Sequence, residues 1–471
     1  MIDATDLGAP MNLGEEYRLN LPMLTFGFDE SFMNYFGTRG VAEVEKAIQI
    51  LNDLPPFSQM SADLNEFPLD TRRFNYLASA LNLYDLKTDI LSGLLEQMGL
   101  AAPERYVWTL RNYIPPDAGP IFTVIQRNFD PITFEPSSYV NGSLYTYQIL
   151  QTYTNPEVWE AVEYEVDPTV PNVSSVAALG GVNAGTIFAN GLIPTFSPGM
   201  FYTGLTRDDV AGLRYLMRPN NFNTEPIVTN AVAALYGSGN GIVGQGTPNP
   251  WLPPPFGTNA ATTNTIPTNA VVNVALRGGV DKVTFVRVNY DSLTGSWVPL
   301  TNYWTDYYVT NGVRRSQQLQ RALAVPDIVF SAADLGVNPN TGVPILTLRT
   351  VAFSNQDAIN GTETLAGPGV LSPPTRYAVS KLGRSYLLPG GGEANHTSLP
   401  WWGSYDGTTN LPALYPVGAS IRALENAIMT GRQSGVNPWL APPNYQTTSG
   451  TNQTGGTGGT VGGGLGGGTG P

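Results

Sequence analysis

The segment Leu86-Lys-Thr-Asp-Ile-Leu-Ser-Gly-Leu-Leu-Glu-Gln-Met98, followed by Gly99, carries the clearest helical pattern in the first half of the chain. Its apolar residues recur at steps of three and four, which places them on one face of a helix. Those residues are Ile90, Leu91, Leu94, Leu95 and Met98. Gly99 stands where a C-terminal cap is needed, since glycine adopts the left-handed conformation without strain. The segment therefore predicts an amphipathic helix.

Further helices and strands are predicted on both sides of this helix. An extended apolar segment at Glu16–Phe28 precedes a helix over Asp29–Leu54, and a shorter helix is expected at Thr71–Leu81. Residues 104–200 alternate between strand patterns and loops. The mixture predicts an α+β domain over residues 1–237.

The second half of the chain has a different character. Residues 238–267 are rich in Gly, Pro, Asn and Thr and carry no charge, which indicates a linker. Residues 268–432 contain short alternating segments bounded by turn residues and predict an all-β, antiparallel sandwich-like domain. Residues 433–471 form a Gly/Thr-rich tail of low complexity. The strands expected in the β domain are Ala270–Leu276, Lys282–Tyr290, Trp297–Leu300, Tyr303–Thr310, Asp327–Phe330, Ile345–Phe353 and Arg376–Ser380.

The composition excludes several functional classes. The 471 residues include 24 Lys or Arg and 37 Asp or Glu, which gives a net charge of −13, and no cysteine. Disulfides, cysteine-ligated zinc, iron–sulfur clusters and thiol catalysis all need cysteine. Binding to nucleic acid needs clustered Lys and Arg, which this acidic chain does not supply. No cofactor is expected.

The composition also favours a location outside the cell. Charged residues make up 13% of the chain, and Gly (52) and Pro (39) are abundant. No apolar run reaches 18 residues, so no transmembrane helix is expected, and no signal-peptide pattern is visible. We therefore expect an extracellular or cell-surface protein.

Residues 20–220 resemble the matrixin branch of the metzincin metalloproteases. Thr206 and Asp209 match a capping box at the start of a helix, and that helix resembles the closing helix of the family. The segments that carry the resemblance are Thr25–Phe32, Asp85–Ala102, Gly199–Tyr202 and Leu205–Leu213. They resemble the first strand and helix, the zinc helix, the methionine turn and the closing helix. The rest of the chain resembles uncharacterised secreted bacterial proteins.

The resemblance implies an inherited fold without the inherited zinc site. With Gly99 as the turn glycine, the three zinc-ligand positions hold Ser92, Glu96 and Ala102, and the general-base position holds Gly93. Catalytic zinc needs three protein ligands and a water. The single histidine, His396, lies far away in the β region. The degenerate positions predict neither a catalytic residue nor a metal, and the reading leans away from an enzyme.

Other residues that could carry chemistry have weaker patterns. His396 is the one possible base of a Ser-His-Asp triad, and no nucleophile-elbow motif accompanies it. The densest carboxylate clusters, which could act in glycoside hydrolysis, are Glu160, Glu163 and Glu165 together with Asp208 and Asp209. Asp327 and Asp334 could contribute to a calcium loop. Helix capping explains Asp208 and Asp209 equally well.

Aromatic residues supply the binding candidates. Trp251 and Trp439 lie in two similar segments, Asn249–Pro254 and Asn437–Pro443, which flank the β region. Each Trp either packs on its own sheet or anchors an interface with another chain. Sugar stacking is a role for exposed aromatic rings, and the candidates for it are Trp401, Trp402 and Tyr405.

Three functions are compatible with these patterns. The favoured one is a secreted or cell-surface structural protein that binds copies of itself in a filament or surface layer. The alternatives are a catalytically altered, metalloprotease-like hydrolase and a surface protein that binds polysaccharide.

Overall fold

The computed structural model describes parts of the chain between Arg18 and Glu425. The described residues are 18–100, 107–114, 119, 121–126, 128–130, 132–152, 158–167, 176, 198–226, 231–233, 272, 274–333, 336–337, 344–345, 375–380, 401–422 and 424–425. The linker over 238–267 and the tail over 433–471 lie outside them. No helix among the described residues combines the length and apolarity needed to cross a bilayer.

The described residues combine helices with many strands in several small sheets, an α+β architecture. The helices are α1 (Glu30–Asn52), α2 (Tyr76–Ala80), α3 (Leu86–Met98), α5 (Arg207–Met217) and the short 3-10 helix Phe57–Gln59. The strands of the first half are β1 (Met23–Phe28), β2 (Arg72–Phe74), β3 (Leu83–Asp85), β4 (Trp108–Ile114), β5 (Ile121–Gln126), β6 (Tyr139–Val140), β7 (Ser143–Thr152), β8 (Val158–Glu165), β9 (Met200–Tyr202), β10 (Asn223–Pro226) and β11 (Ala231–Ala233). The strands of the second half are β12 (Val274–Arg277), β13 (Thr284–Arg287), β14 (Tyr290–Asp291), β15 (Ser296–Trp297), β16 (Leu300–Thr310), β17 (Val313–Leu323), β18 (Ile328–Ala333), β19 (Gly336–Val337), β20 (Pro344–Ile345), β21 (Thr375–Ser380), β22 (Trp401–Ser404) and β23 (Ala413–Leu414).

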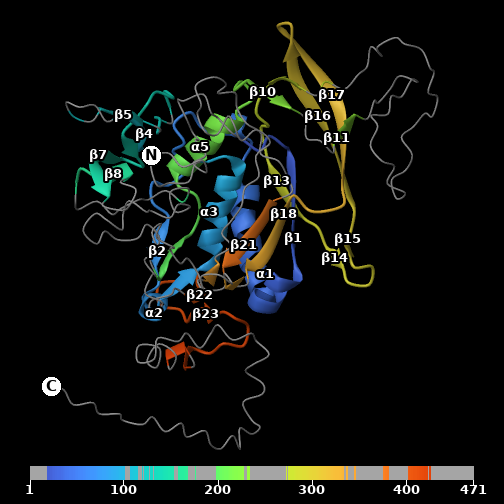
Figure 1. Ribbon diagram of the computed structural model, residues 1–471. Coiled ribbons are helices and arrows are strands. Elements are labelled where there is room, and N and C mark those ends of the chain that lie inside the picture. The colour runs from blue at the N-terminus through green and yellow to red at the C-terminus, as the bar shows by residue number, and fades with distance from the viewer. Residues whose placement is uncertain are drawn as a thin grey trace, which may run out of the picture.

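A parallel four-stranded sheet and helix α1 form the centre of the molecule (Figure 1). The strand order is β13-β1-β18-β21, and every pair in the sheet is parallel. Helix α1 packs against β1, β13 and β18 and also against α3. Asp29, predicted as the first residue of the helix, instead caps α1 by accepting a hydrogen bond from the backbone N–H of Phe32.

The described strands of the two halves share one core, although the sequence places a linker between them at residues 238–267. Strand β1 lies between β13 and β18, with Phe26 paired to Arg287 on one side and to Ile328 on the other. The rings of Phe28 and Phe330 stack with their centroids 5.5 Å apart. An apolar strand that is buried on both faces needs strand neighbours for its backbone groups. The second half of the chain supplies them.

The strands expected to form an antiparallel sandwich divide between two kinds of sheet. Strands β13, β18 and β21 are parallel members of the central sheet. Strands β12, β16 and β17 instead join an antiparallel sheet of order β10-β12-β16-β17-β11. A short apolar strand pairs equally well in either direction, and the available neighbours decide which. The antiparallel prediction is wrong for the first three strands.

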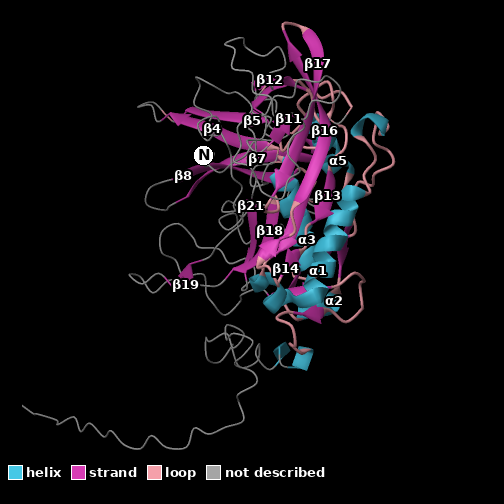
Figure 2. Cartoon of the chain, turned by 90° about the vertical axis from the view of Figure 1, so that its right-hand side faces the viewer, coloured by secondary structure: helices cyan, strands magenta, loops and turns pink. Residues whose placement is uncertain are grey.

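The long hairpin of β16 and β17 extends away from the central layer (Figures 1 and 2). Its two strands pair in register from Leu300 opposite Leu323 to Thr310 opposite Val313. Its neighbours cover it in part, because β12 pairs with Tyr308 and Val309, and β11 pairs with residues 319–321. The turn between the strands lies at the top of both views, far from α2.

Residues near the end of the described chain pack against the region of α2. Strand β22 pairs in parallel with β3, and Leu424 is buried in a small cluster with Ala78 and Leu81. The helix expected over Thr71–Leu81 is replaced by strand β2 and the short helix α2. Asn75 begins α2 and accepts a hydrogen bond from the backbone N–H of Ala78, which shortens the helix at its start.

Candidate functional site

Helix α3 begins and ends where the sequence predicts. Asp85 accepts hydrogen bonds from the backbone N–H and the hydroxyl of Thr88, at 2.9 and 2.6 Å. Gly99 has a φ of 112°, a backbone conformation that glycine adopts readily at a helix C-terminus. These two ends fix the rotation of the helix, so they also fix which side chains face the core.

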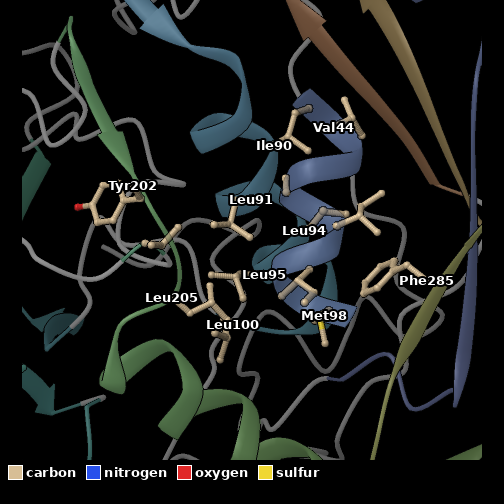
Figure 3. Close-up of a cluster of buried hydrophobic side chains, with 14 of the residues drawn as sticks. Val44, Ile90, Leu91, Leu94, Leu95, Met98, Leu100, Tyr202, Leu205 and Phe285 are labelled. Carbon is tan, nitrogen blue, oxygen red and sulfur yellow. The ribbon is translucent and has the colours of Figure 1, made fainter. Parts of the chain in front are cut away.

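Of the positions that resemble the zinc site, Ser92 and Gly93 lie inside the apolar core. Ser92 and Gly93 are buried, and the neighbouring Leu91 and Leu94 have no exposed surface. Figure 3 shows Leu91, Leu94, Leu95 and Met98 among side chains from other elements, including Val44, Leu205 and Phe285. The side chain of Glu96 and the whole of Ala102 lie outside the described residues. Ser92 and Gly93 are therefore covered by side chains of the core and do not face solvent.

Polar atoms on α3 are buried without partners among the described residues. They are the Ser92 hydroxyl and both amide atoms of Gln97. Burying a polar group without a hydrogen bond costs about 1–3 kcal/mol. Among the described residues, no second side chain orients these atoms.

The segment that resembles a methionine turn lies against the start of α3. The backbone N–H of Tyr202 donates to the Thr88 hydroxyl at 3.0 Å, and that of Gly199 donates to the Leu83 carbonyl at 2.8 Å. Gly199 has a φ of 85°, and a Cβ there would lie 2.6 Å from the Asn75 carbonyl oxygen. Met200 is buried beside this contact. A glycine is therefore required at this turn.

Helix α5 follows with the capping box that the sequence predicts. The Thr206 side chain accepts from the backbone N–H of Asp209, and the Asp209 carboxylate accepts from the backbone N–H and hydroxyl of Thr206 at 2.8 and 2.6 Å. Asp208 and Asp209 lie in the first turn of the helix. The capping box accounts for the Asp209 carboxylate, and the place of Asp208 in the first turn is favoured by the helix dipole.

Charged side chains surround the start of α3. Burial raises the pKa of Asp85 to about 6, while the Lys87 ammonium and the hydrogen bonds from Thr88 act in the opposite direction. Glu43 on α1 also raises the Asp85 pKa and pairs with Lys46, whose ammonium lies 2.9 Å from its carboxylate. The second oxygen of Asp85, Oδ1, has no hydrogen-bond partner among the described residues. A carboxyl with this pKa can exchange a proton near neutral pH, yet its burial keeps it from substrates in solvent.

Two of the three sugar-stacking candidates are not on the surface. Trp402 and Tyr405 are buried, and the Tyr405 hydroxyl donates to the Leu83 carbonyl at 2.9 Å. The side chain of Trp401 lies outside the described residues. Trp402 pairs with Tyr84 of β3 and Tyr405 donates a hydrogen bond to Leu83, so both rings pack against the region of β3 and cannot stack on a sugar.

Other candidate residues are scattered. Asp327 is buried and accepts from the backbone N–H and hydroxyl of Thr25 at 2.8 and 2.9 Å, which leaves it unsuited to a calcium loop. Glu165 accepts a hydrogen bond from the Tyr145 hydroxyl at 3.2 Å. The residues outside the described part are Asp334, His396, Trp251 and Trp439, together with the side chains of Glu160 and Glu163.

The sequence analysis did not identify two exposed surfaces. The first, which we name the α2 patch, consists of Phe74, Tyr76, Leu77 and Leu411. The second, which we name the tyrosine face, consists of Leu276, Tyr303, Tyr307 and Arg314. A period of two along β16 could have placed the tyrosines on one face. No local pattern joins residue 411 to residues 74–77.

The comparisons add no family or relative. Among the described residues, no three His, Asp or Glu side chains lie close enough together to hold a metal ion. Comparison of the chain with protein-family models, with curated proteins and with solved structures found no match.

Proposed function

We propose that this chain is a secreted or cell-surface structural protein that binds copies of itself. The observation that supports it most is the α2 patch. Exposed apolar side chains are ordinary when single, whereas a contiguous group of large ones is typical of an interaction surface. Low charge and the location expected from composition agree with such a role.

The α2 patch is built from two segments that are distant in the sequence and hydrogen-bonded to each other. The rings of Phe74 and Tyr76 lie 5.7 Å apart, and the Tyr76 backbone N–H donates to the Thr408 carbonyl at 3.1 Å. The Asn75 amide donates to the Asn410 carbonyl at 3.0 Å, next to Leu411. Tyr76 is 66% exposed and Leu411 73% exposed. Burying these side chains in a contact would be favourable at about 25 cal/mol per Å² of apolar surface.

The proposed structural role also accounts for the burial of Ser92 and Gly93, in the helix that resembles the zinc helix of the metzincins. A metzincin-type ancestry is supported by α3 packed on α1, by the Gly199–Tyr202 segment against Thr88, and by α5 with its capping box. In this reading, apolar packing has replaced the metal as the stabiliser of α3. The hydrolase alternative has less support, since Ser92 and Gly93 are buried.

The test is the state of assembly of the full chain. Sedimentation velocity over a hundredfold range of concentration, with electron microscopy of negatively stained samples, should show species larger than a monomer. The variant Tyr76→Ser with Leu411→Ser should reduce association, because it removes the two most exposed members of the α2 patch. A wild-type chain that stays monomeric at every concentration would exclude the proposal.

A further inference from the structure

The tyrosine face is a flat, half-exposed surface on the five-stranded sheet. Tyr303 and Tyr307 project from the same side of β16, because side chains alternate along a strand. Leu276 of β12 pairs with Val309, so it lies on that side too. Arg314 of β17 pairs with Val309 from the other strand, and its guanidinium lies 5.0 Å from the centroid of the Tyr307 ring.

The hairpin is basic although the chain is acidic. Its exposed charges are Arg314 and Arg315 near the turn. Its one carboxylate, Asp306, is paired with Arg277 at 3.2 Å. The whole chain carries a net charge of −13. A hairpin of this charge is attracted to the rest of a second copy and repelled by a second hairpin.

This repulsion bears on the symmetry of a contact. Two hairpins that met around a two-fold axis would bring four arginines together. A contact between different surfaces of the two copies avoids this, and such a head-to-tail contact continues into an open filament unless its rotation closes a ring.

The α2 patch lies at the opposite end of the molecule from the hairpin turn. The β16–β17 turn is at the top in both views, and α2 is in the lower part of the body in both (Figures 1 and 2). The aromatic rings of Phe74 and Tyr76 can accept an arginine over their faces, and the apolar Leu77 and Leu411 can pack against tyrosine rings. Arg73 and Asp406, one of each sign, are exposed beside the patch and leave it near neutral.

We propose that the tyrosine face of one copy packs on the α2 patch of the next copy, head to tail. This inference rests on the proposed function and adds the two surfaces that meet. It commits to a second copy of this chain because tyrosine and arginine are frequent anchors of protein interfaces and because the hairpin is opposite in charge to the rest of the molecule.

The experiment uses two full-length variants that each remove one surface. The hairpin variant carries Tyr303→Ser and Tyr307→Ser, and the patch variant carries Tyr76→Ser and Leu411→Ser. Each alone should weaken self-association by at least about tenfold. An equimolar mixture should form a 1:1 dimer and stop there, because a single intact pair of surfaces remains. The control is Leu293→Ser, a change at a 96% exposed residue between β14 and β15, which should assemble as the wild type does.

Each other outcome has a defined meaning. A hairpin variant that assembles like the wild type overturns the inference and leaves the proposed function standing. A mixture that stays monomeric overturns the head-to-tail pairing. A wild-type chain that is monomeric throughout removes the proposed function and the inference together. Retention of the wild type on insoluble cellulose or chitin, lost in the hairpin variant without any change in assembly, would assign the tyrosine face to polysaccharide instead.

Discussion

The apolar core around α1 and α3 differs from the polar contacts that join this core to the five-stranded sheet. In the core, the two helices meet mainly through aliphatic and aromatic side chains, with a few buried polar residues such as Ser92 and Gln97 among them. We call the polar contacts between this core and the five-stranded sheet the polar junction, and they are made by buried charged side chains. Its members are Arg18, Glu225, Arg277, Asp306, Arg321 and Asp327.

The geometry of the polar junction is specific. The Arg18 guanidinium is fully buried, lies 2.6 Å from the Glu225 carboxylate and donates to the Leu216 and Arg277 carbonyls at 2.5 and 3.0 Å. Arg321 forms a buried pair with Asp327. The core tolerates changes of shape at moderate cost, whereas a buried charge that loses its partner costs much more. The two regions should therefore respond differently to matched substitutions.

The largest effect is expected at the polar junction. Arg18→Met should lower the free energy of unfolding by about 3–5 kcal/mol, because it leaves the Glu225 carboxylate buried without its partner. Burial already raises the pKa of Glu225, and Arg18 opposes that rise. Urea denaturation of the full chain, followed by tryptophan fluorescence, measures the loss.

A matched double variant separates the charge from the packing. Arg18→Met with Glu225→Gln should recover part of the stability that Arg18→Met alone loses, since no charge stays unpaired. A double variant that is as unstable as the sum of the two single variants would mean that the pair acts through packing alone.

The second largest loss of stability is expected in the apolar core. Leu94→Ala should cost about 2–5 kcal/mol, since Leu94 is fully buried on α3 and its loss leaves a cavity. Leu94→Met, which nearly conserves volume, should cost less than about 1.5 kcal/mol. The same urea measurement applies. If the two variants lost equal free energy of unfolding, the stability at this position would depend on the shape of the side chain and not on its buried volume.

A smaller, pH-dependent effect is expected from the carboxyl beside the core. Folding raises the pKa of Asp85 from 3.8 to about 6, so the neutral form is favoured in the folded state. The stability that it contributes is complete below pH 3.8 and is lost as the pH rises through 6. By this linkage the contribution falls by about 1.4 kcal/mol between pH 5 and pH 7.5.

Asp85→Asn should remove that pH dependence. The asparagine carbonyl can still accept from Thr88, but it does not titrate. Unfolding free energies of the wild type and the variant, compared at pH 5 and pH 7.5, measure the difference. Asp406→Asn, at an exposed carboxyl, is the control and should leave the wild-type slope unchanged. The same slope in Asp85→Asn as in the wild type would assign the pH dependence to other groups.

The smallest effect is expected at a feature that the local sequence encodes by itself. Thr206→Ala removes the capping box of α5 and should cost about 1 kcal/mol. Thr206→Ser keeps the hydroxyl and should cost less. Thermal unfolding monitored by circular dichroism detects both. A loss of stability as large as that of Arg18→Met would contradict the expectation that a local helix cap contributes less than a buried ion pair between distant segments.

Local patterns predicted much of the secondary structure. The apolar steps over 86–98 and the apolar face within 29–54 correspond to α3 and α1, and the capping residues of α5 are in place. Such patterns succeed because a helix is stabilised by contacts within four residues and by one apolar face. The same reasoning failed at Thr71–Leu81, where strand β2 pairs with β9 from far along the chain.

For the candidate site, the sequence predicted which chemical groups are missing but not which residues are buried. The positions of Ser92 and Gly93 could be derived from Gly99, but their burial depended on neighbours from α1, α5 and β13. Trp402 and Tyr405 had the composition of a surface site, yet strand β22 pairs with β3 and buries them. Burial of an aromatic ring depends on which distant segment covers it.

By itself, the sequence determined that helices begin close to Glu30, Leu86 and Arg207, and it determined the absence of cysteine chemistry. These properties depend on residue identity or on contacts within a turn or two of helix. The tertiary structure alone decided that β1 lies between β13 and β18 and that Arg18 meets Glu225, 207 residues away. Strand partners and buried ion pairs join residues at large sequence separation. Their choice reflects the competition of all segments for one core, and no local pattern records its outcome.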